Sequence, residues 1–251
     1  MKLQILGSSS HGNCYLFISE NSNEVLAVEA GVDFQKVQRA VDYRIGNIVG
    51  CLISHEHGDH ASRVGGFEGR CIAIYASPGT VKALRKPNGA SPFLRAVPPL
   101  KSIRICGFEV LPFPVQHDAA EPFGFLIRHE ECGTVLFATD TYFLKYRFPG
   151  LNNILLECNY RKDLLDANLA AGRIDHRRYD RTVQSHMSYE NCLRTLHAND
   201  LSEVNNIVLL HLSDDNSNEK EFVSGIAREF PDTTVTAAAP GITINLNKHP
   251  Y

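Results

Sequence analysis

The amino-acid sequence predicts an α/β fold in which two β-sheets pack face to face and helices cover their outer faces, a four-layer α/β/β/α sandwich. Both halves of the chain begin with short apolar runs typical of strands, and both continue with alternating strands and amphipathic helices. No internal repeat, low-complexity tract or linker interrupts the 251 residues. We therefore expect residues 1–251 to form one domain.

In the first half, the expected strands are short apolar runs separated by Gly, Ser, Asn and His. They cover residues 3–7, 14–19, 25–29, 49–54 and 72–75. Three helices are expected among them, at residues 33–43, 59–67 and 78–85. Ser77 caps the third of these helices, and Pro78 occupies its first turn. Residues 87–92, rich in Pro, Asn and Gly, then read as a loop.

The second half repeats the plan, with a group of strands followed by alternation. The expected strands cover residues 102–106, 108–113, 124–128, 134–138, 154–157, 207–211, 235–239 and 242–246. The expected helices cover residues 161–171, 188–199 and 218–230. Ser188 is the N-cap of the second of these, and Glu190 in its first turn favours the helix dipole.

Composition indicates an ordinary globular protein, with 43% hydrophobic and 21% charged residues. No apolar stretch approaches the ~20 residues that span a bilayer, and the first residues turn polar too soon for a signal peptide. Seven cysteines lie scattered in the chain without a Cys-x-x-Cys pair, which favours reduced thiols over disulfides or a zinc finger. We expect a cytoplasmic protein with no membrane partner.

The net charge of −3 is unevenly distributed. Residues 69–108 contain no Asp or Glu but seven basic residues, namely Arg70, Lys82, Arg85, Lys86, Arg95, Lys101 and Arg104. Such a stretch can attract a phosphate backbone or can simply be a solvated face. A second basic segment, residues 161–181, contains six Lys or Arg diluted by four Asp, and the same two interpretations apply to it.

The strongest signal is the run Ser54-His55-Glu56-His57-Gly58-Asp59-His60, which holds four candidate metal ligands. An apolar run precedes it, and residues that can start a helix follow. His55 and His57 would leave the strand end pointing the same way, and Asp59 and His60 would turn in from the first helical turn. Imidazole and carboxylate groups suit zinc, manganese or iron, and this spacing can serve two neighbouring ions.

One such motif cannot complete two metal sites, so further ligands should follow other strands, where a rigid element fixes their position. His117, Asp140 and His211 each follow an apolar run. Each alone is compatible with a turn acid or a hydrogen-bonded histidine. Together, and in this order after the first motif, they indicate a metal centre.

These motifs and their order resemble those of the metallo-β-lactamase-fold hydrolases, which have the α/β/β/α architecture and a binuclear site. The resemblance implies that His55, His57 and His117 hold one ion and that Asp59, His60 and His211 hold the other. It also implies that Asp140 bridges both. The family usually has Asp where this chain has Glu29, as a partner that orients metal-binding histidines.

The resemblance implies two divalent ions as cofactors, for which we expect zinc, with manganese or iron as alternatives. Two such ions about 3.5–4 Å apart can hold a hydroxide between them as the nucleophile, so no Ser or Cys nucleophile is needed. Ser8, Ser9 and Ser10 therefore read as a non-catalytic turn at the rim of the site. His11 or Asn13 in the same turn is a candidate for substrate contact, although a simple turn is the preferred interpretation.

Glu157 at a strand end and His186 in the turn Ser185-His186-Met187-Ser188 resemble residues of ribonuclease Z and related phosphodiesterases. There, such a pair assists proton transfer near the phosphate. Asp59, His186 and Glu157 are thus the expected catalytic residues.

Residues 8–15, residues 28–31 and the metal and histidine motifs look most like the compact YycJ-like branch, which is associated with nuclease activity on DNA. We expect a nucleic acid substrate, DNA first. The alternatives are a thioesterase, lactonase or glyoxalase-type hydrolase and a non-catalytic, metal-stabilised DNA-binding or regulatory protein. The motifs carry no information on oligomeric state.

Overall fold

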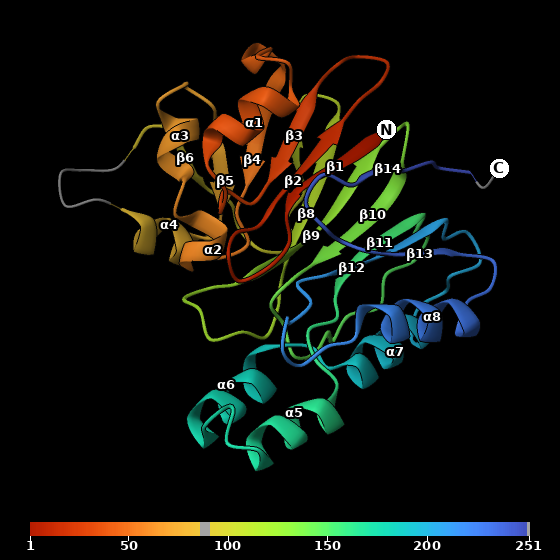
Figure 1. Cartoon of the computed structure of the whole chain (residues 1–251). Coiled ribbons are helices and arrows are strands. Elements are labelled where there is room, and N and C mark those ends of the chain that lie inside the picture. Colours follow the sequence, from red (N-terminus) through yellow and green to blue (C-terminus); the bar gives the residue numbers. More distant parts are fainter. Residues whose placement is uncertain (86–90, 250–251) are drawn as a thin grey trace.

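A computed structural model describes residues 1–85 and 91–249 of the protein (Figure 1). Within these ranges the strands form two sheets of seven strands each, and helices flank them, as the sequence predicts. The described helices contain no stretch that is both long enough and apolar enough to cross a membrane. Lys86 and most of the expected loop at residues 87–92 lie outside the described residues.

The first sheet has the strand order β14-β1-β2-β3-β4-β5-β6. Its strands are β1 Lys2–Gly7, β2 Cys14–Ile18, β3 Val25–Val28, β4 Ile48–Leu52, β5 Ile74–Ala76, β6 Leu94–Ala96 and β14 Thr243–Asn245. Strands β3 to β6 run parallel to one another, so their carboxyl ends lie at one edge of the sheet. The last strand of the chain returns to pair with β1, which ties the end of the chain to its beginning.

The second sheet has the strand order β13-β12-β11-β10-β9-β8-β7. Its strands are β7 Ile103–Ile105, β8 Phe108–Pro114, β9 Phe123–His129, β10 Gly133–Ala138, β11 Asn153–Glu157, β12 Asn206–Leu210 and β13 Thr234–Ala237. Strands β10 to β13 are parallel. The two halves of the chain therefore build similar sheets, each with a parallel part whose carboxyl ends can present polar residues together.

Helices cover the outer faces of both sheets. They are α1 Phe34–Ala40, α2 Gly58–Ala61, α3 Val64–Glu68, α4 Pro78–Leu84, α5 Lys162–Ala170, α6 His176–Ser185, α7 Tyr189–His197 and α8 Glu219–Glu229. In Figure 1, α1 to α4 gather beside the first sheet and α7 and α8 beside the second. Helices α5 and α6 form a pair that projects from one end of the sandwich.

Three apolar cores correspond to these layers. The central core lies between the sheets and includes Phe17, Phe125 and Phe137. The second joins α1, α3 and α4 to the first sheet, and the third joins α7 and α8 to the second sheet. Because each sheet is covered on both faces, its central strands are buried throughout and mainly apolar rather than alternating.

The structure corrects the sequence-based element boundaries in four places. The helix expected at residues 33–43 ends at Ala40, and the one expected at residues 59–67 is split into α2 and α3 around Arg63. Strand β6 and helix α6 were not predicted. Ser185 is the only buried residue of helix α6, so the sequence of this helix has no apolar stripe that would predict it.

A polar contact joins the two sheets at the end of β2 and β9. Glu131, in the turn between β9 and β10, accepts hydrogen bonds from the Ser19 hydroxyl and from the backbone N–H groups of Glu20 and Asn21. Partial burial opposes ionisation of this carboxyl, but the hydrogen bonds outweigh it and lower its pKa from 4.5 to about 2. The ionised form is thus favoured by the folded state.

Replacing this carboxylate should cost stability in a pH-dependent way. We expect Glu131→Gln to lower the free energy of unfolding at pH 7 by roughly 1–3 kcal/mol, because charge-assisted hydrogen bonds are lost. A carboxyl whose pKa is lowered by folding stabilises the protein above its unfolded pKa, and that contribution disappears as the pH falls from 4.5 toward 2. Urea unfolding should therefore show the difference from wild type shrinking over this interval. Glu130→Gln, an exposed acid in the same turn, is the control, and an equal loss in both variants would contradict the prediction.

Candidate metal centre

The histidine-rich run begins after the end of β4 and continues into α2. His55 is buried and follows the strand, and His57 is the residue at the N-cap of α2. The His57 carbonyl accepts the backbone N–H groups of His60 and Ala61, which winds the chain into the first helical turn at once. Asp59 and His60 therefore point back toward the histidines of the strand end, as the spacing predicts.

A first group of ligand atoms is formed by His55, His57 and His117, whose nearest nitrogens lie within 4.8 Å of one another. His117 comes from the segment after β8. Its Nδ1 lies 2.8 Å from the Ser185 carbonyl oxygen, which can only accept, so Nδ1 carries the proton. The lone pair of neutral His117 is then on Nε2, which lies 3.2 Å from His57 Nδ1.

A second group is formed by Asp59, His60, Asp140 and His211, again within 4.8 Å. His60 Nε2 lies 3.3 Å from Asp59 Oδ2 and 3.4 Å from Asp140 Oδ2. His211, directly after β12, lies with Nδ1 3.1 Å from Asp140 Oδ1 and with Nε2 3.6 Å from Asp59 Oδ2. All seven residues expected as ligands are therefore brought together in these two adjoining groups.

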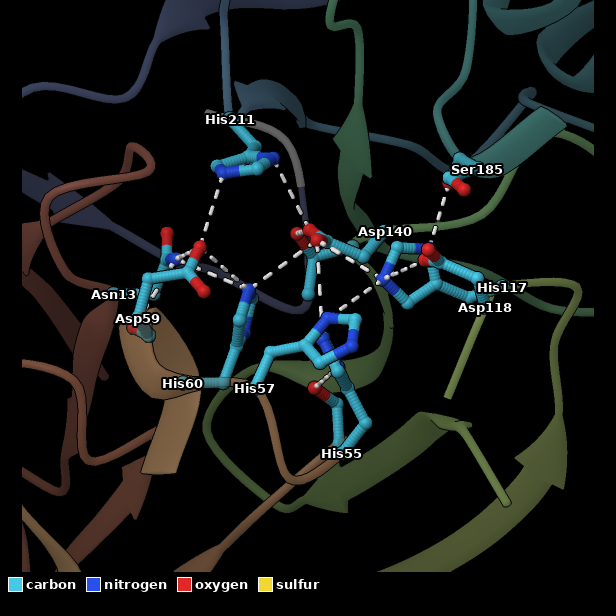
Figure 2. Close-up of polar contacts among 12 residues, drawn as sticks. Asn13, His55, His57, Asp59, His60, His117, Asp118, Asp140, Ser185 and His211 are labelled. Carbon is cyan, nitrogen blue, oxygen red and sulfur yellow. Dashed lines mark hydrogen bonds and ion pairs between the residues drawn. The ribbon is translucent and has the colours of Figure 1, made fainter. Parts of the chain in front are cut away.

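Asp140 lies between the two groups, as Figure 2 shows. Its Oδ2 is 3.4 Å from His60 Nε2 in the second group, and 3.6 Å from His117 Nε2 and 3.9 Å from His55 Nε2 in the first. The carboxylate is almost wholly buried, and the Thr139 hydroxyl donates to its Oδ1. One oxygen thus faces nitrogens of both groups, which is the position a bridging ligand needs.

Glu29 and Asn13 contact His60 and Asp59 of the second group. Glu29 is fully buried, with Oε2 3.6 Å from His60 Nδ1. The Asn13 side chain approaches Asp59 Oδ2 at 3.4 Å and His60 Nε2 at 3.2 Å. Gly31 allows this packing, because a Cβ there would lie 1.7 Å from the Asp59 carbonyl oxygen. Asn13 is thus buried beside the ligands. The alternative from the sequence, that Asn13 contacts a substrate at the rim of the site, does not fit this position. His11, the other candidate in this turn, is exposed.

A buried relay fixes the backbone of His211. The Tyr15 hydroxyl lies in the core between the sheets and donates to Ser8 Oγ at 2.7 Å. Ser8 Oγ in turn accepts the His211 backbone N–H at 3.0 Å. The turn of residues 8–10, expected to be non-catalytic, thus has a positioning role that its composition did not reveal.

Glu157 and His186 form the second predicted feature of the site. Glu157 is fully buried at the end of β11, and its Oε1 accepts from His186 Nδ1 at 2.7 Å. Its Oε2 accepts the backbone N–H groups of Thr141 and Met187. Burial lowers the pKa of His186, but the neighbouring Glu157 carboxylate outweighs this effect and raises it above 6.5. The His186 ring lies 5.5 Å from that of His117 and 5.4 Å from that of His211.

A cavity of about 350 Å³ opens over both groups. His57, Asp59, His117, Asp140, His186 and His211 contribute to its wall. Arg178, Arg181 and Thr182 of α6 also line it, as do Asp214 and Asp215. Helix α6 therefore brings two guanidinium groups to the cavity, each in an ion pair, Arg178 with Asp215 and Arg181 with Asp118. Guanidinium groups can exchange a carboxylate partner for a phosphate.

The other basic residues lie differently. Two of the other four in residues 161–181 are paired locally, Arg161 with Asp163 and Lys162 with Asp166. Those of residues 69–108 that the structure describes are exposed but spread over several elements, and Arg104 lies in a separate hollow with four acids. They do not gather at the metal centre.

The donor set suits divalent cations. Burial lowers the pKa of His55, which favours its neutral imidazole. Burial raises the pKa of Asp140, but the charges of His211 and His60 outweigh it and hold this pKa well below 3.8, which favours the carboxylate. In turn, Asp140 overcomes the effect of burial and raises the pKa of both His60 and His211. Among the ligand atoms, His55 Nε2 and His211 Nε2 are buried without a hydrogen-bond partner within the described part of the chain. Unpaired buried nitrogens are costly unless another group meets them, and a metal ion does so.

An α/β/β/α sandwich with histidine and carboxylate ligands gathered at the strand ends is the arrangement of a metal-dependent hydrolase. The sequence model of the family described as "Beta-lactamase superfamily domain" matches residues 26–211. The chain belongs to this superfamily.

Among curated relatives, the chain is 27% identical to "Exodeoxyribonuclease YycJ" of Bacillus anthracis, over 93% of this chain and 95% of that protein. Among solved structures, it resembles the metallo-beta-lactamase fold protein YhfI from Bacillus subtilis, with a TM-score of 0.71 and 17% identity over 97% of this chain and 98% of that one. A diphosphatase from the PhnP family matches with a TM-score of 0.67 and 16% identity over 100% and 99%. The two structural similarities establish the fold, and the sequence relative confirms the resemblance to the YycJ-like branch.

Removing the Ser8 hydroxyl should loosen the metal centre. In Ser8→Ala the His211 N–H loses its partner and the buried Tyr15 hydroxyl keeps only a longer contact of 3.4 Å to Asn13 Oδ1, and we expect the unfolding free energy to fall by about 1–3 kcal/mol. Metal affinity should fall about 10- to 100-fold, the usual cost of losing a group that orients a ligand. Competition with a chromogenic chelator measures the second effect. Ser10→Ala, an exposed serine in the same turn, should change neither quantity, and unchanged affinity in Ser8→Ala would refute the relay.

Proposed function

We propose that this protein is a binuclear metal-dependent phosphodiesterase that shortens DNA from an end, acting as an exonuclease. The observation that carries the proposal is the Glu157–His186 pair in the wall of the cavity. Because His186 Nδ1 is bonded to Glu157, Nε2 is the nitrogen available to a substrate. An imidazole kept protonated by a carboxylate can donate a proton to the leaving oxygen of a phosphodiester.

Two ions per chain follow from the grouping of the ligands. His55, His57 and His117 would hold one ion, Asp59, His60 and His211 the other, and Asp140 would contribute to both. Glu29 and Asn13 would orient the second group. We expect zinc, with manganese or iron as alternatives, since all three accept imidazole and carboxylate ligands. Residues 1–251 would act as one domain.

Divalent ions bound here would lower the pKa of a water to provide the nucleophile and would offset the charge of the phosphate. The remaining steps belong to the chain. Arg178 and Arg181, which line the same cavity, can hold the phosphate, and His186 protonates the leaving oxygen. Glu157 keeps the His186 ring in place and favours its charged form, as the raised pKa of His186 indicates.

DNA is the proposed substrate for two reasons. The relative named exodeoxyribonuclease is aligned with nearly the whole of this chain. The cavity is also polar and carries two arginines, which favours a phosphate over the acyl groups of a thioester or lactone.

Metal analysis tests the binuclear site. We expect two ions per wild-type chain after dialysis, about one in His57→Ala, which removes a ligand from one group, and fewer than one in Asp140→Ala, which weakens both. His11→Ala, an exposed histidine outside both groups, should retain two. A single ion in the wild type, or two in Asp140→Ala, would contradict the assignment.

Loss of the His186 imidazole should separate catalysis from metal binding. We expect His186→Ala to lower kcat on 5′-phosphorylated, end-labelled DNA about a hundredfold or more, with unchanged metal content, because proton donation is lost. His197→Ala, an exposed histidine on α7, is the control. Full activity in His186→Ala would exclude the proposed role. Hydrolysis of thioesters or lactones but not DNA by the two-metal wild type would favour an acyl hydrolase, and binding without cleavage a regulatory protein.

A further inference from the structure

A second groove, of about 630 Å³, opens beside the cavity of the metal centre. His117 and Arg181 line both, so the two spaces adjoin. One wall of the groove is helix α6, through Arg177, Arg181 and Gln184. The other includes Tyr142, two residues after Asp140. Any chain-like substrate with its reactive bond at the ligands can therefore extend into this groove.

Exposed apolar side chains are concentrated here. Five large apolar side chains are exposed in the part of the chain that the structure describes, namely Tyr43, Leu100, Tyr142, Phe143 and Val183. Tyr142 lines the groove, and Phe143 and Val183 are next in sequence to lining residues; Tyr142 and Phe143 are 38% and 48% exposed. Aromatic rings left in water at a groove indicate a surface that binds something.

The backbone that displays these rings is held firmly. The Tyr142 N–H donates to the Gln116 carbonyl, and its own carbonyl accepts from the Asn191 side chain. The buried Thr141 hydroxyl donates to the Phe143 carbonyl. Both rings therefore project from an ordered turn, and a ligand that stacks on them need not order the backbone first.

The charge around the groove suits a polyanion. Arg177 and Arg181 lie one turn apart on α6, so they share a face of the helix. Asp118 and Asp180 oppose them, but Asp118 is already paired with Arg181 at 3.2 Å. Residues 141–156, the segment that carries the exposed rings, contain Lys145 and Arg147 and no acid.

We propose that this groove binds the single-stranded end of a nucleic acid. Tyr142 and Phe143 stack on unpaired bases, and Arg177 and Arg181 contact the phosphates between them. Stacking requires bases whose faces are free, so the site selects single strands or frayed ends over closed duplex. The inference rests on the proposed function, because it assumes that the strand entering the groove is the one whose bond lies at the metal centre.

Binding is measured by fluorescence anisotropy with a labelled oligothymidylate of about 12 nucleotides, a length in the range that such sites cover. Phosphorothioate linkages prevent turnover, so the metal-loaded protein is used. We expect the wild type to bind this probe at least about tenfold more tightly than a duplex of equal length. The double variant Tyr142→Ala/Phe143→Ala should lose about tenfold or more in affinity for the single strand. Tyr43→Ala, which removes a ring that is 68% exposed outside this groove, should bind as the wild type does.

A second variant covers the case in which the double variant does not fold. Arg177→Ala, on an exposed helical face, should reduce the slope of log K against log salt by about 0.7, the value for one phosphate contact on a single strand. Equal binding of single strand and duplex by the wild type, or an unchanged slope in Arg177→Ala, would overturn the inference.

The proposed function is tested apart from the groove. Hydrolysis of the small diester bis(p-nitrophenyl) phosphate depends on the metal centre and needs no long strand. If the wild type hydrolyses this diester and degrades DNA but shows no preference for single strands, the groove proposal alone fails. If the wild type binds single strands as expected but hydrolyses neither substrate, the proposed function fails and the groove remains a nucleic-acid site.

Discussion

The structure depends on the convergence of buried electron-pair donors at one edge of the sandwich. His57 Nδ1 and His117 Nε2 lie 3.2 Å apart, and the hydrogen bond from His117 Nδ1 to the Ser185 carbonyl leaves a lone pair on His117 Nε2. Asp140 adds a buried carboxylate beside them. Such an arrangement is unfavourable in isolation and becomes favourable around a cation. The residues around the ligands, among them Ser8 and the buried Glu29, hold these electron-pair donors close together against their mutual repulsion.

The metal ligands and the fold class could be predicted from the sequence, because the patterns that indicate them lie within short segments of the chain. Each strand that carries a ligand is a run of consecutive apolar residues, buried on both faces, and its polar ligand follows where the run stops. This made His117, Asp140 and His211 recognisable one at a time, and the order of the motifs made the resemblance specific. The fold class followed for the same reason, since two sheets covered on both sides need apolar strands and amphipathic helices in alternation.

The other features of the site depend on tertiary contacts, which leave no pattern within a short segment of the sequence. Helix α6 has no apolar stripe, and its Arg178 and Arg181 pair with acids far along the chain, Asp215 and Asp118. The sequence allowed its basic residues to contact phosphate, but neither the helix itself nor the groove beside it was predictable. Asn13 and Ser8 looked like turn residues because their partners are backbone groups and side chains brought close only by folding. The acid-free stretch of residues 69–108 was a pattern in sequence that folding spreads over separate elements.

Three residues at the metal centre share an unusual backbone conformation. Glu29, Asp140 and His211 have φ values of 68°, 47° and 54°, in the left-handed region, and each follows closely on the end of a strand. This turn directs the side chain across the strand ends instead of onward with the chain, at a cost that glycine would not incur. The bound cations would offset this cost, so the heat resistance of the protein should depend on its metal supply. Two preparations of one sequence that differ in metal content alone should then unfold at different temperatures.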